Sequence, residues 1–392
     1  MANTAAAPAQ GAQKAQPAPL PFRVGAQPES NQDFVPAAVT LGTGTQPLPV
    51  YHPSAESFLR GVWIQVVATT SGNSATVAFK GDAPFNVINT ISFTDVQQRF
   101  VVGPINGYDL MAIDKFGGYN NTNDPRADVN YLATTGTGGT GGSFAFSLYL
   151  PLEWDLRTGM GALVNKSTAS TFSVNVTIET EANVYSTSPT TAPSVQVTFS
   201  QEAYLQPATA DAQGNPLSQS PQAVGSTQYW ARSAVGGAGA LSSGSFQNVQ
   251  LQGGLGFPLR NIIFECYDTS AGTRAAGDTD FPTTLLVTYK GVQLLNQNKS
   301  LWKTKMGRKF GYTNTAADSA LGVENGVYVI EFDLDNTNTP GSASLDNALL
   351  QTNTGTVLAI SGSMNASATI YELCNWLVPA SGNPGSIRAG GR

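Results

Sequence analysis

The chain has 392 residues, which is long for one hydrophobic core and suits two domains of fewer than about 200 residues each. Only 12% of the residues are Asp, Glu, Lys or Arg, a composition typical of a loop-rich all-β protein or of a subunit largely covered by its neighbours. The formal net charge of −6 indicates no globally basic surface, so direct sequence-specific binding of nucleic acid is not expected.

Residues 1–32 are rich in Ala, Gln and Pro and have almost no apolar periodicity. This composition predicts a flexible N-terminal arm with no core of its own, or alternatively an inert tail. Its basic residues, Lys14 and Arg23, are candidate contacts of the arm. The first twenty residues lack the basic start and apolar core of a secretory signal, so we expect synthesis and assembly in a cytoplasm.

From residue 33 onward, strand candidates are separated by turns rich in Gly, Pro, Asn, Ser and Thr. Alternating apolar residues, as in Phe144, Phe146, Leu148 and Leu150, indicate strands with one buried face. The candidates are 34–41, 57–70, 86–95, 98–103, 143–152, 171–179 and 194–205 in the first half, then 244–252, 259–268, 283–295, 326–334, 356–363 and 367–378.

Two short helices are expected, at about 105–115 and 298–309. In the second, Trp302, Met306 and Phe310 would lie on one face and pack on the neighbouring strands.

Composition also predicts the domain boundaries. A first β-sandwich is expected at 33–206 and a second at 228–380, joined by the Pro/Gly/Ser/Gln-rich linker 207–227. The Gly/Ser/Pro-rich segment 381–392 is expected to be a flexible tail.

The two halves resemble each other in sequence. The segment from Leu59-Arg60 to Gly72 matches Leu259-Arg260 to Gly272 at Leu, Arg, Thr and Gly. Further matches follow in the same order, Lys115-Phe116-Gly117 with Lys309-Phe310-Gly311 and Ala162-Leu163 with Ala348-Leu349. The separation shrinks along the chain, which indicates a tandem duplication whose second copy has shorter loops.

Within the repeat, Gln65 and Glu265 occupy the same face of equivalent strands. We therefore expect the opposite faces to point into the cores. These faces consist of Val62, Ile64 and Val66 in the first copy and Ile262, Phe264 and Cys266 in the second. Cys266 and Cys374, both in apolar runs, are expected to be buried and reduced.

No catalytic or metal-binding arrangement is indicated. The single histidine, His52, cannot supply a cluster of metal ligands or a catalytic triad by itself. The glycine-rich segment 136–142 precedes a strand and lacks the Lys-Ser/Thr ending of a phosphate-binding loop. The carboxylate pairs at strand ends are most simply solvated termini; they are Glu153 with Asp155 and Asp333 with Asp335. We expect no enzymatic activity and no cofactor.

The two predicted helices differ in charge. Aligned at a separation of 194 residues, Asp109 stands opposite Lys303 and Asp114 opposite Arg308. Two interpretations remain open: the helix faces are solvated independently, or domains of unlike type touch around a ring, where opposite charges fix the register. In the second case these four residues are candidate intersubunit contacts.

The passage Phe146-Ser-Leu-Tyr-Leu-Pro151-Leu152, followed by Gly161-Ala162-Leu163 and the strand Phe172–Ile178, resembles a passage in the first domain of a known viral family. The family is the double jelly-roll major capsid proteins of the tectivirus-like lineage of membrane-containing bacterial viruses. The resemblance implies an all-β fold of two tandem eight-stranded jelly rolls, each with a short flanking helix.

The resemblance also implies a structural function. Family members form homotrimers with a pseudo-hexagonal outline that tile an icosahedral shell over an internal membrane. A subunit of this kind would be a virion component made in the host cytoplasm, with itself, penton proteins and minor capsid or membrane proteins as partners. The arm would lie on the membrane side, although it lacks the basic amphipathic helix that binds lipid. The alternative is a carbohydrate-binding or adhesive spike or fibre protein built from two β-sandwiches.

Overall fold

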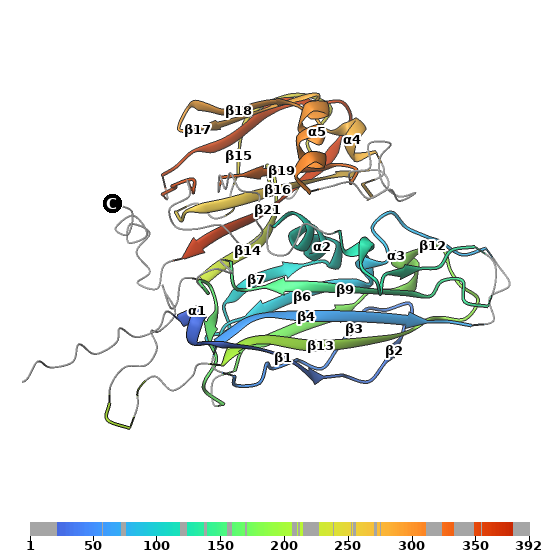
Figure 1. Cartoon of the computed structure of the whole chain (residues 1–392). Coiled ribbons are helices and arrows are strands. Elements are labelled where there is room, and N and C mark those ends of the chain that lie inside the picture. The colour runs from blue at the N-terminus through green and yellow to red at the C-terminus, as the bar shows by residue number, and fades with distance from the viewer. Residues whose placement is uncertain are drawn as a thin grey trace, which may run out of the picture.

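The computed structural model describes most of the chain between residues 22 and 378. The described ranges are 22–56, 58–71, 76–117, 124–136, 139–154, 159–168, 171–205, 210, 212–214, 227–237, 239–251, 253, 256–269, 273–274, 276–310, 324–332, 349–353 and 355–378. Two β-sandwiches are stacked on one another, and we call them roll 1 (residues 27–205) and roll 2 (residues 227–378) (Figure 1).

Roll 1 consists of two facing four-stranded sheets, ordered β1-β13-β4-β9 and β3-β11-β6-β7. The first contains β1 (Gln27–Phe34), β13 (Ser194–Leu205), β4 (Phe58–Thr69) and β9 (Phe144–Pro151); the second contains β3 (Gln46–Pro47), β11 (Ser173–Ile178), β6 (Ile88–Thr94) and β7 (Phe100–Ile105). Short strands β2 (Val39–Thr40), β8 (Leu132–Ala133) and β10 (Leu163–Val164) extend the first sheet, and β5 (Ala78–Phe79) pairs with β12 (Tyr185–Thr187).

Roll 2 repeats this arrangement, with sheets ordered β14-β21-β16-β19 and β15-β20-β17-β18. The first contains β14 (Thr227–Ala234), β21 (Ala368–Val378), β16 (Leu259–Asp268) and β19 (Val327–Glu331); the second contains β15 (Gly244–Gln250), β20 (Leu358–Met364), β17 (Thr284–Tyr289) and β18 (Val292–Asn298). The main sheets of each roll therefore contain eight strands in the same order, which confirms the all-β double jelly roll and the duplication.

Local pairing confirms the equivalence of the two copies. Leu59 of β4 pairs with Leu163, and its counterpart Leu259 of β16 pairs with Leu350. The sequence match placed Leu349 in this role, so the true register differs by one residue. The backbone carbonyl of Arg60 accepts a hydrogen bond from Leu152, as the carbonyl of Arg260 does from Phe332.

The expected helices are present as α2 (Gly107–Phe116) and α5 (Lys299–Phe310). The Asn106 side chain accepts from the Asp109 amide and the Asp109 carboxylate accepts from the Asn106 amide, a capping box that begins α2. Trp302, Met306 and Phe310 are buried as expected. The remaining short helices are α1 (Phe22–Gly25), α3 (Glu181–Val184), α4 (Gly277–Asp280), η1 (Phe85–Val87) and η2 (Pro125–Ala127).

The cores are formed by the faces that the alternation predicted. Val62, Ile64 and Val66 of β4 are each 0% exposed, as are Ile262, Phe264 and Cys266 of β16. Both cysteines are buried thiols without a disulfide.

Three sequence-based expectations are corrected. The arm was expected to reach residue 32, but β1 begins at Gln27 and pairs with β13. Phe22 of α1 also packs edge-on against Phe58 and Tyr204 at 5.2 and 5.4 Å. The expected strand 283–295 is a hairpin, because Lys290 and Gly291 have φ angles of 51° and 77° that turn the chain between β17 and β18.

Glu153, expected to be a solvated strand end, is 1% exposed. Its carboxylate accepts from Arg60 Nε at 2.8 Å and from the Tyr204 hydroxyl at 2.7 Å. The residues Asp155, Asp333 and Asp335 lie outside the described part of the chain.

Candidate assembly surfaces

The two rolls are joined edge to edge. Strand β7 at the end of the second sheet of roll 1 pairs in parallel with β14 at the start of the first sheet of roll 2, with Val102 opposite Trp230. This pairing makes one eight-stranded sheet that runs through both rolls, ordered β19-β16-β21-β14-β7-β6-β11-β3. The joint therefore pairs two edge strands that are not equivalent in the repeat.

Helix α2 lies between the rolls in Figure 1. Its first residue must be glycine, since a Cβ on Gly107 would come within 2.0 Å of the Phe85 carbonyl oxygen. At its other end Phe116 meets its repeat counterpart Phe310 edge-on, with ring centroids 5.1 Å apart. Both faces of α2 are consequently buried, one against β9 of its own roll and the other against roll 2.

Buried charges cross the joint. The Asp109 Oδ1 atom lies 3.4 Å from Nε of Arg232 on β14, and Asp109 is 0% exposed. Burial raises the pKa of Asp109 and, more strongly, that of its hydrogen-bond partner Glu265 on β16. The nearby negative charge of Asp109 raises the pKa of Glu265 further, whereas the positive charge of Arg232 lowers the pKa of both carboxyls.

A second buried cluster ties the end of α2 to roll 2. Lys115 Nζ lies 2.5 Å from Asp124 Oδ2 in roll 1 and 2.8 Å from Glu324 Oε1 in roll 2. Arg126 Nη2 reaches the same Glu324 oxygen at 2.9 Å. All four side chains are at most 7% exposed, so the cluster holds the rolls in one register only as long as every charge keeps a partner.

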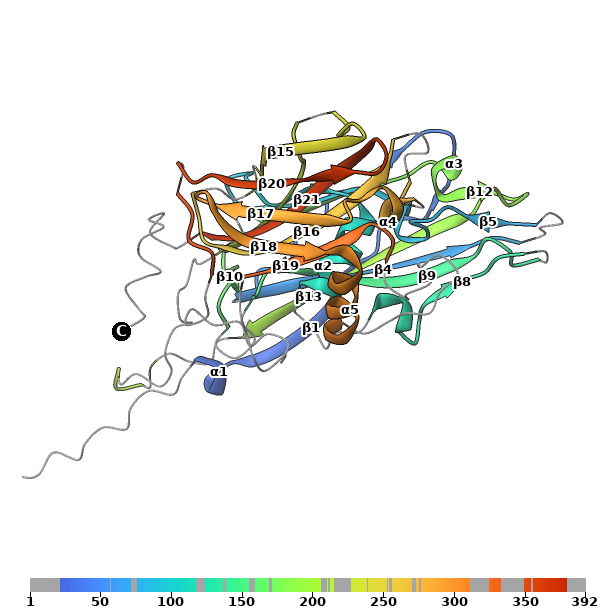
Figure 2. The same ribbon diagram turned by 90° about the horizontal axis from the view of Figure 1, so that it is seen from above.

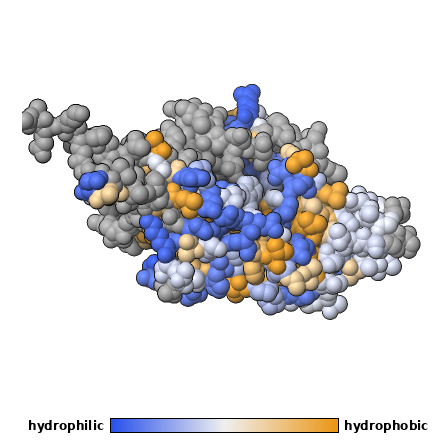
Figure 3. Space-filling model, turned by 60° about the horizontal axis from the view of Figure 1, so that its bottom comes forward, coloured by the Kyte–Doolittle hydropathy of each residue, from blue (hydrophilic) through white to orange (hydrophobic). Residues whose placement is uncertain are grey.

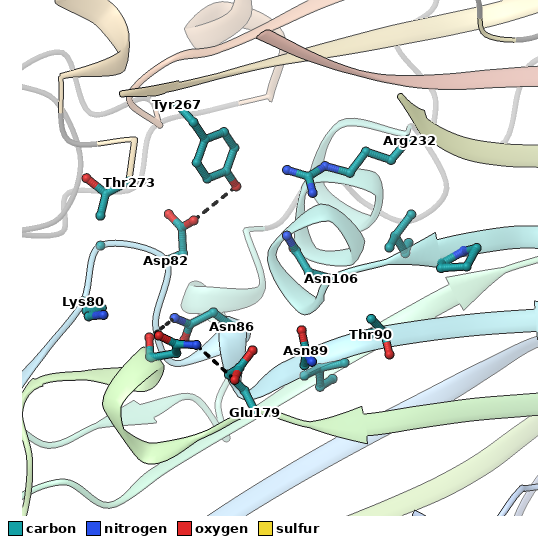
Figure 4. A pocket seen from close by; sticks show the side chains of 15 residues that line it. Lys80, Asp82, Asn86, Asn89, Thr90, Asn106, Glu179, Arg232, Tyr267 and Thr273 are labelled. Atoms are coloured by element: carbon teal, nitrogen blue, oxygen red, sulfur yellow. Dashed lines mark hydrogen bonds between the residues drawn. The ribbon is translucent and has the colours of Figure 1, made fainter. Parts of the chain in front are cut away.

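An open pocket of about 570 Å³ lies beside this joint, and Figure 4 shows its lining. Tyr267 of β16 donates to Asp82 Oδ2 at 3.2 Å, and Arg274 Nε donates to Asp82 Oδ1 at 3.0 Å. The Arg274 guanidinium stacks 3.6 Å from the centre of the Tyr108 ring. Asp82 and Tyr267 line this pocket, and Arg274 and Tyr108 line a neighbouring one, so contacts that join the two rolls lie beside both pockets.

The predicted charge exchange between the helices is observed, but its partners are internal. Asp109 and Lys303 are buried within the chain, and Lys303 Nζ lies 3.1 Å from Asp278 Oδ1. Asp114 is partly buried and accepts a hydrogen bond from the Tyr149 amide at 3.1 Å. The partners described for these three residues lie in the same chain, and their contact with a second subunit stays a prediction. Arg308 is exposed and stays a candidate.

The candidate arm contacts cannot be placed. Lys14 lies outside the described residues, and Arg23 belongs to α1, where its side chain is outside the description as well. His52 has Nδ1 2.9 Å from the Phe172 carbonyl oxygen, a local contact within roll 1.

The residues that connect the rolls were missed by sequence reasoning, chiefly Arg232, Glu265 and Glu324. One signal was available for Glu265: its repeat counterpart is the uncharged Gln65. A carboxylate in one copy and an amide in the other indicate different surroundings for otherwise similar strands.

No helix within the described ranges is long and apolar enough to cross a membrane. The same residues contain no group of three or more His, Cys, Asp or Glu side chains placed to hold a metal ion.

Searches with the sequence found no matching family model and no matching curated protein. The fold, however, is similar to several solved structures. A chain of Sulfolobus Turreted Icosahedral Virus aligns with a TM-score of 0.58 and 12% identity over 93% of this chain and 95% of its own.

Two further structures agree with this. The major capsid protein P2 of bacteriophage PM2 aligns with a TM-score of 0.51 and 10% sequence identity over 90% of this chain and 97% of its own. The Faustovirus major capsid protein aligns with a TM-score of 0.53 and 9% sequence identity over 93% of this chain and 92% of its own. At such identities the likeness establishes the architecture, and it extends over nearly the whole length of both chains. The chain therefore has the double jelly-roll fold of these viral major capsid proteins.

Proposed function

We propose that this chain is a major capsid protein, a structural subunit of a virion. The observation that carries the proposal is the complete double jelly roll, with both rolls and both flanking helices. The rolls are held in fixed register by buried charges and a shared sheet, which suits a rigid building block. The low charge content also suits a subunit covered by its neighbours.

The assembly unit in this proposal is a homotrimer. Three copies of a chain with two similar rolls supply six similar units, which gives a closed ring with a pseudo-hexagonal outline. Such units tile an icosahedral shell and meet penton and minor capsid proteins at special positions. The proposal includes an internal membrane beneath the shell, toward which the N-terminal arm points.

The mass of the purified chain in solution tests this proposal. Light scattering coupled to size-exclusion chromatography is expected to give three times the 40.9 kDa of one chain. A chain that stays monomeric up to high concentration, and forms no shells when its virion is reassembled, would contradict it. Lipid extraction of purified particles tests the membrane separately.

A further inference from the structure

The two rolls are joined through strands β7 and β14, and each of these strands has a counterpart in the other roll that does not take part in the joint. By the repeat, β18 of roll 2 is equivalent to β7, and β1 of roll 1 is equivalent to β14. Within the described residues, β18 pairs only with β17 and β1 only with β13, so each ends its sheet with an open edge. Open edges of this kind bind further strands unless something covers them.

Part of the outer face of the sheet that contains β1 is also exposed. Ile263 on the outer face of β16 is 0% exposed, because roll 1 and α2 pack on that face. On the equivalent face of β4, Gln65 is exposed and Val67 is 37% exposed. The side of the molecule that carries β1 and β13 comes forward in Figure 3, where hydrophobic residues stand among hydrophilic ones.

The complementary surface lies on roll 2, where α5 follows directly on β18 at one edge of the molecule (Figure 2). Four residues of α5 at helical spacing form one exposed stripe, namely Leu301, Thr304, Lys305 and Arg308. The adjoining strand exposes Val292 and Leu294 at 69% and 42%. This edge is apolar next to the strand and basic along the helix.

The charges of the two open surfaces are opposite. Strand β1 carries Glu29 and Asp33 and no basic residue, while α5 exposes Lys305 and Arg308 and has no acidic residue. Inside the chain the joint uses the reverse signs, with the acidic Asp109 on α2 and the basic Arg232 on β14. Both arrangements would attract unlike edges and repel like ones.

We propose that the β1 edge and the outer face of its sheet bind the β18 edge and α5 of a second copy of this chain. The contact repeats the internal β7–β14 joint with the charge signs exchanged. It is head-to-tail, so a series of such contacts closes into a ring only if the rotation between copies allows it. The inference rests on the proposed function and supplies the residues that make the capsomer.

Engineered cysteines test the contact in the full-length chain. The internal pair Trp230 and Val102 corresponds to Ser30 of one copy and Asn296 of the next, both of which are exposed. In the double variant Ser30→Cys/Asn296→Cys, oxidised glutathione should link chains to one another, since only cysteines with Cα atoms within about 7 Å can be bridged. Non-reducing gels should show covalent dimers and trimers in place of the monomer band. Ser30→Cys/Leu294→Cys covers a register shift of two residues.

The matched control is Ser30→Cys/Gln247→Cys, in which the second cysteine lies on β15 at the opposite edge of the same sheet as β18. Strong linking in the β18 variants and none in the control supports the contact. Equal linking in the control shows random collision and overturns it. Native trimers by mass with no linking in either β18 variant overturn this contact while leaving the capsid proposal intact. Monomers that never link overturn both.

Discussion

Strands β4 and β16 are equivalent strands of the repeat, but they have different neighbours in the structure. Both contain Leu-Arg near their start and bury one face in a core, yet β16 also buries most of its second face, while β4 exposes Gln65, Val67 and Thr69 on that face. The difference arises because roll 2 packs on roll 1 through this face, whereas no described residue of the chain covers the equivalent face of roll 1 in the same way. The covered face of β16 therefore has an exposed counterpart on β4, and this exposed face is where the proposed contact would place another subunit.

The inward faces should be equally important in both copies. Phe264→Ala on β16 is expected to lower the free energy of unfolding by roughly 3–5 kcal/mol, because it loses burial and leaves a cavity. Ile64→Ala on β4 should cost a similar roughly 2–5 kcal/mol. Chemical denaturation measures both, and a loss under about 1 kcal/mol at either site would show that its face is not core.

The paired lysines should differ sharply. Lys115→Met is expected to cost about 3–5 kcal/mol, because it leaves the buried carboxylates of Asp124 and Glu324 short of a cation. Its counterpart Lys309 bonds Glu331 at 2.6 Å with a side chain 30% exposed, so Lys309→Met should cost only about 0–1 kcal/mol. Equal losses in denaturant titrations would mean that the joint contributes no more than a surface ion pair.

The outward faces should behave in the opposite way from the inward ones. Ile263→Ala is expected to destabilise the isolated chain by roughly 2–4 kcal/mol, since this side chain is enclosed at the joint. Val67→Ala on the open face should change stability by less than about 0.5 kcal/mol. These values apply at concentrations where the chain is monomeric. A large effect of Val67→Ala there would show that β4 is covered within one chain.

Asp114 and its counterpart Arg308 differ in burial, because Asp114 is partly buried and Arg308 is exposed. Burial raises the pKa of Asp114 to about 7 from an ordinary 3.8. Between about pH 4 and pH 7 the unfolded chain has released a proton that the native chain keeps, so stability falls as pH rises through this window. Asp114→Asn should therefore gain on the order of 1–2 kcal/mol at pH 8 and nothing at pH 4.

The control for this effect is Arg308→Gln, which should shift stability uniformly across the same pH range. Thermal unfolding between pH 4 and pH 8 distinguishes the two. If Asp114→Asn follows the wild-type pH profile, the carboxyl titrates normally and the shift is absent.

The smallest effect on stability is expected at the N-terminus. Deleting residues 2–20 should leave the unfolding temperature and the mass in solution unchanged while impairing shell formation, because the first described packing contact in the chain is Phe22. Deleting residues 2–34 removes β1 and should lower the unfolding temperature clearly. A loss of stability with the shorter deletion would extend the core into the arm.

The strongly patterned elements were predictable from the sequence. Long alternating strands such as 57–70 and 194–205 were found within a few residues, because a period of two in apolar residues survives wherever one face is buried. The order of repeated motifs gave the duplication. Both α2 and α5 were placed, since their apolar residues follow helical spacing.

The first strand of each roll, β1 and β14, was missed for a physical reason. Their sequences, QPESNQDF and TQYWARSA, have little apolar alternation, because each strand lies at the edge of its own roll. Their strand structure comes from pairing with β13 and β21, which only the fold provides.

The sequence by itself determined the two rolls, their helices and the exchange of charge between those helices, because each is a local pattern of side chains. Only the tertiary structure decided which charges are buried. Asp109 meets Arg232 across the joint, but its counterpart Lys303 turns into its own roll, and no local pattern distinguishes the two. Burial depends on which residues lie opposite in space. Equivalent residues of a duplicated sequence can therefore be buried at the joint in one copy and exposed in the other.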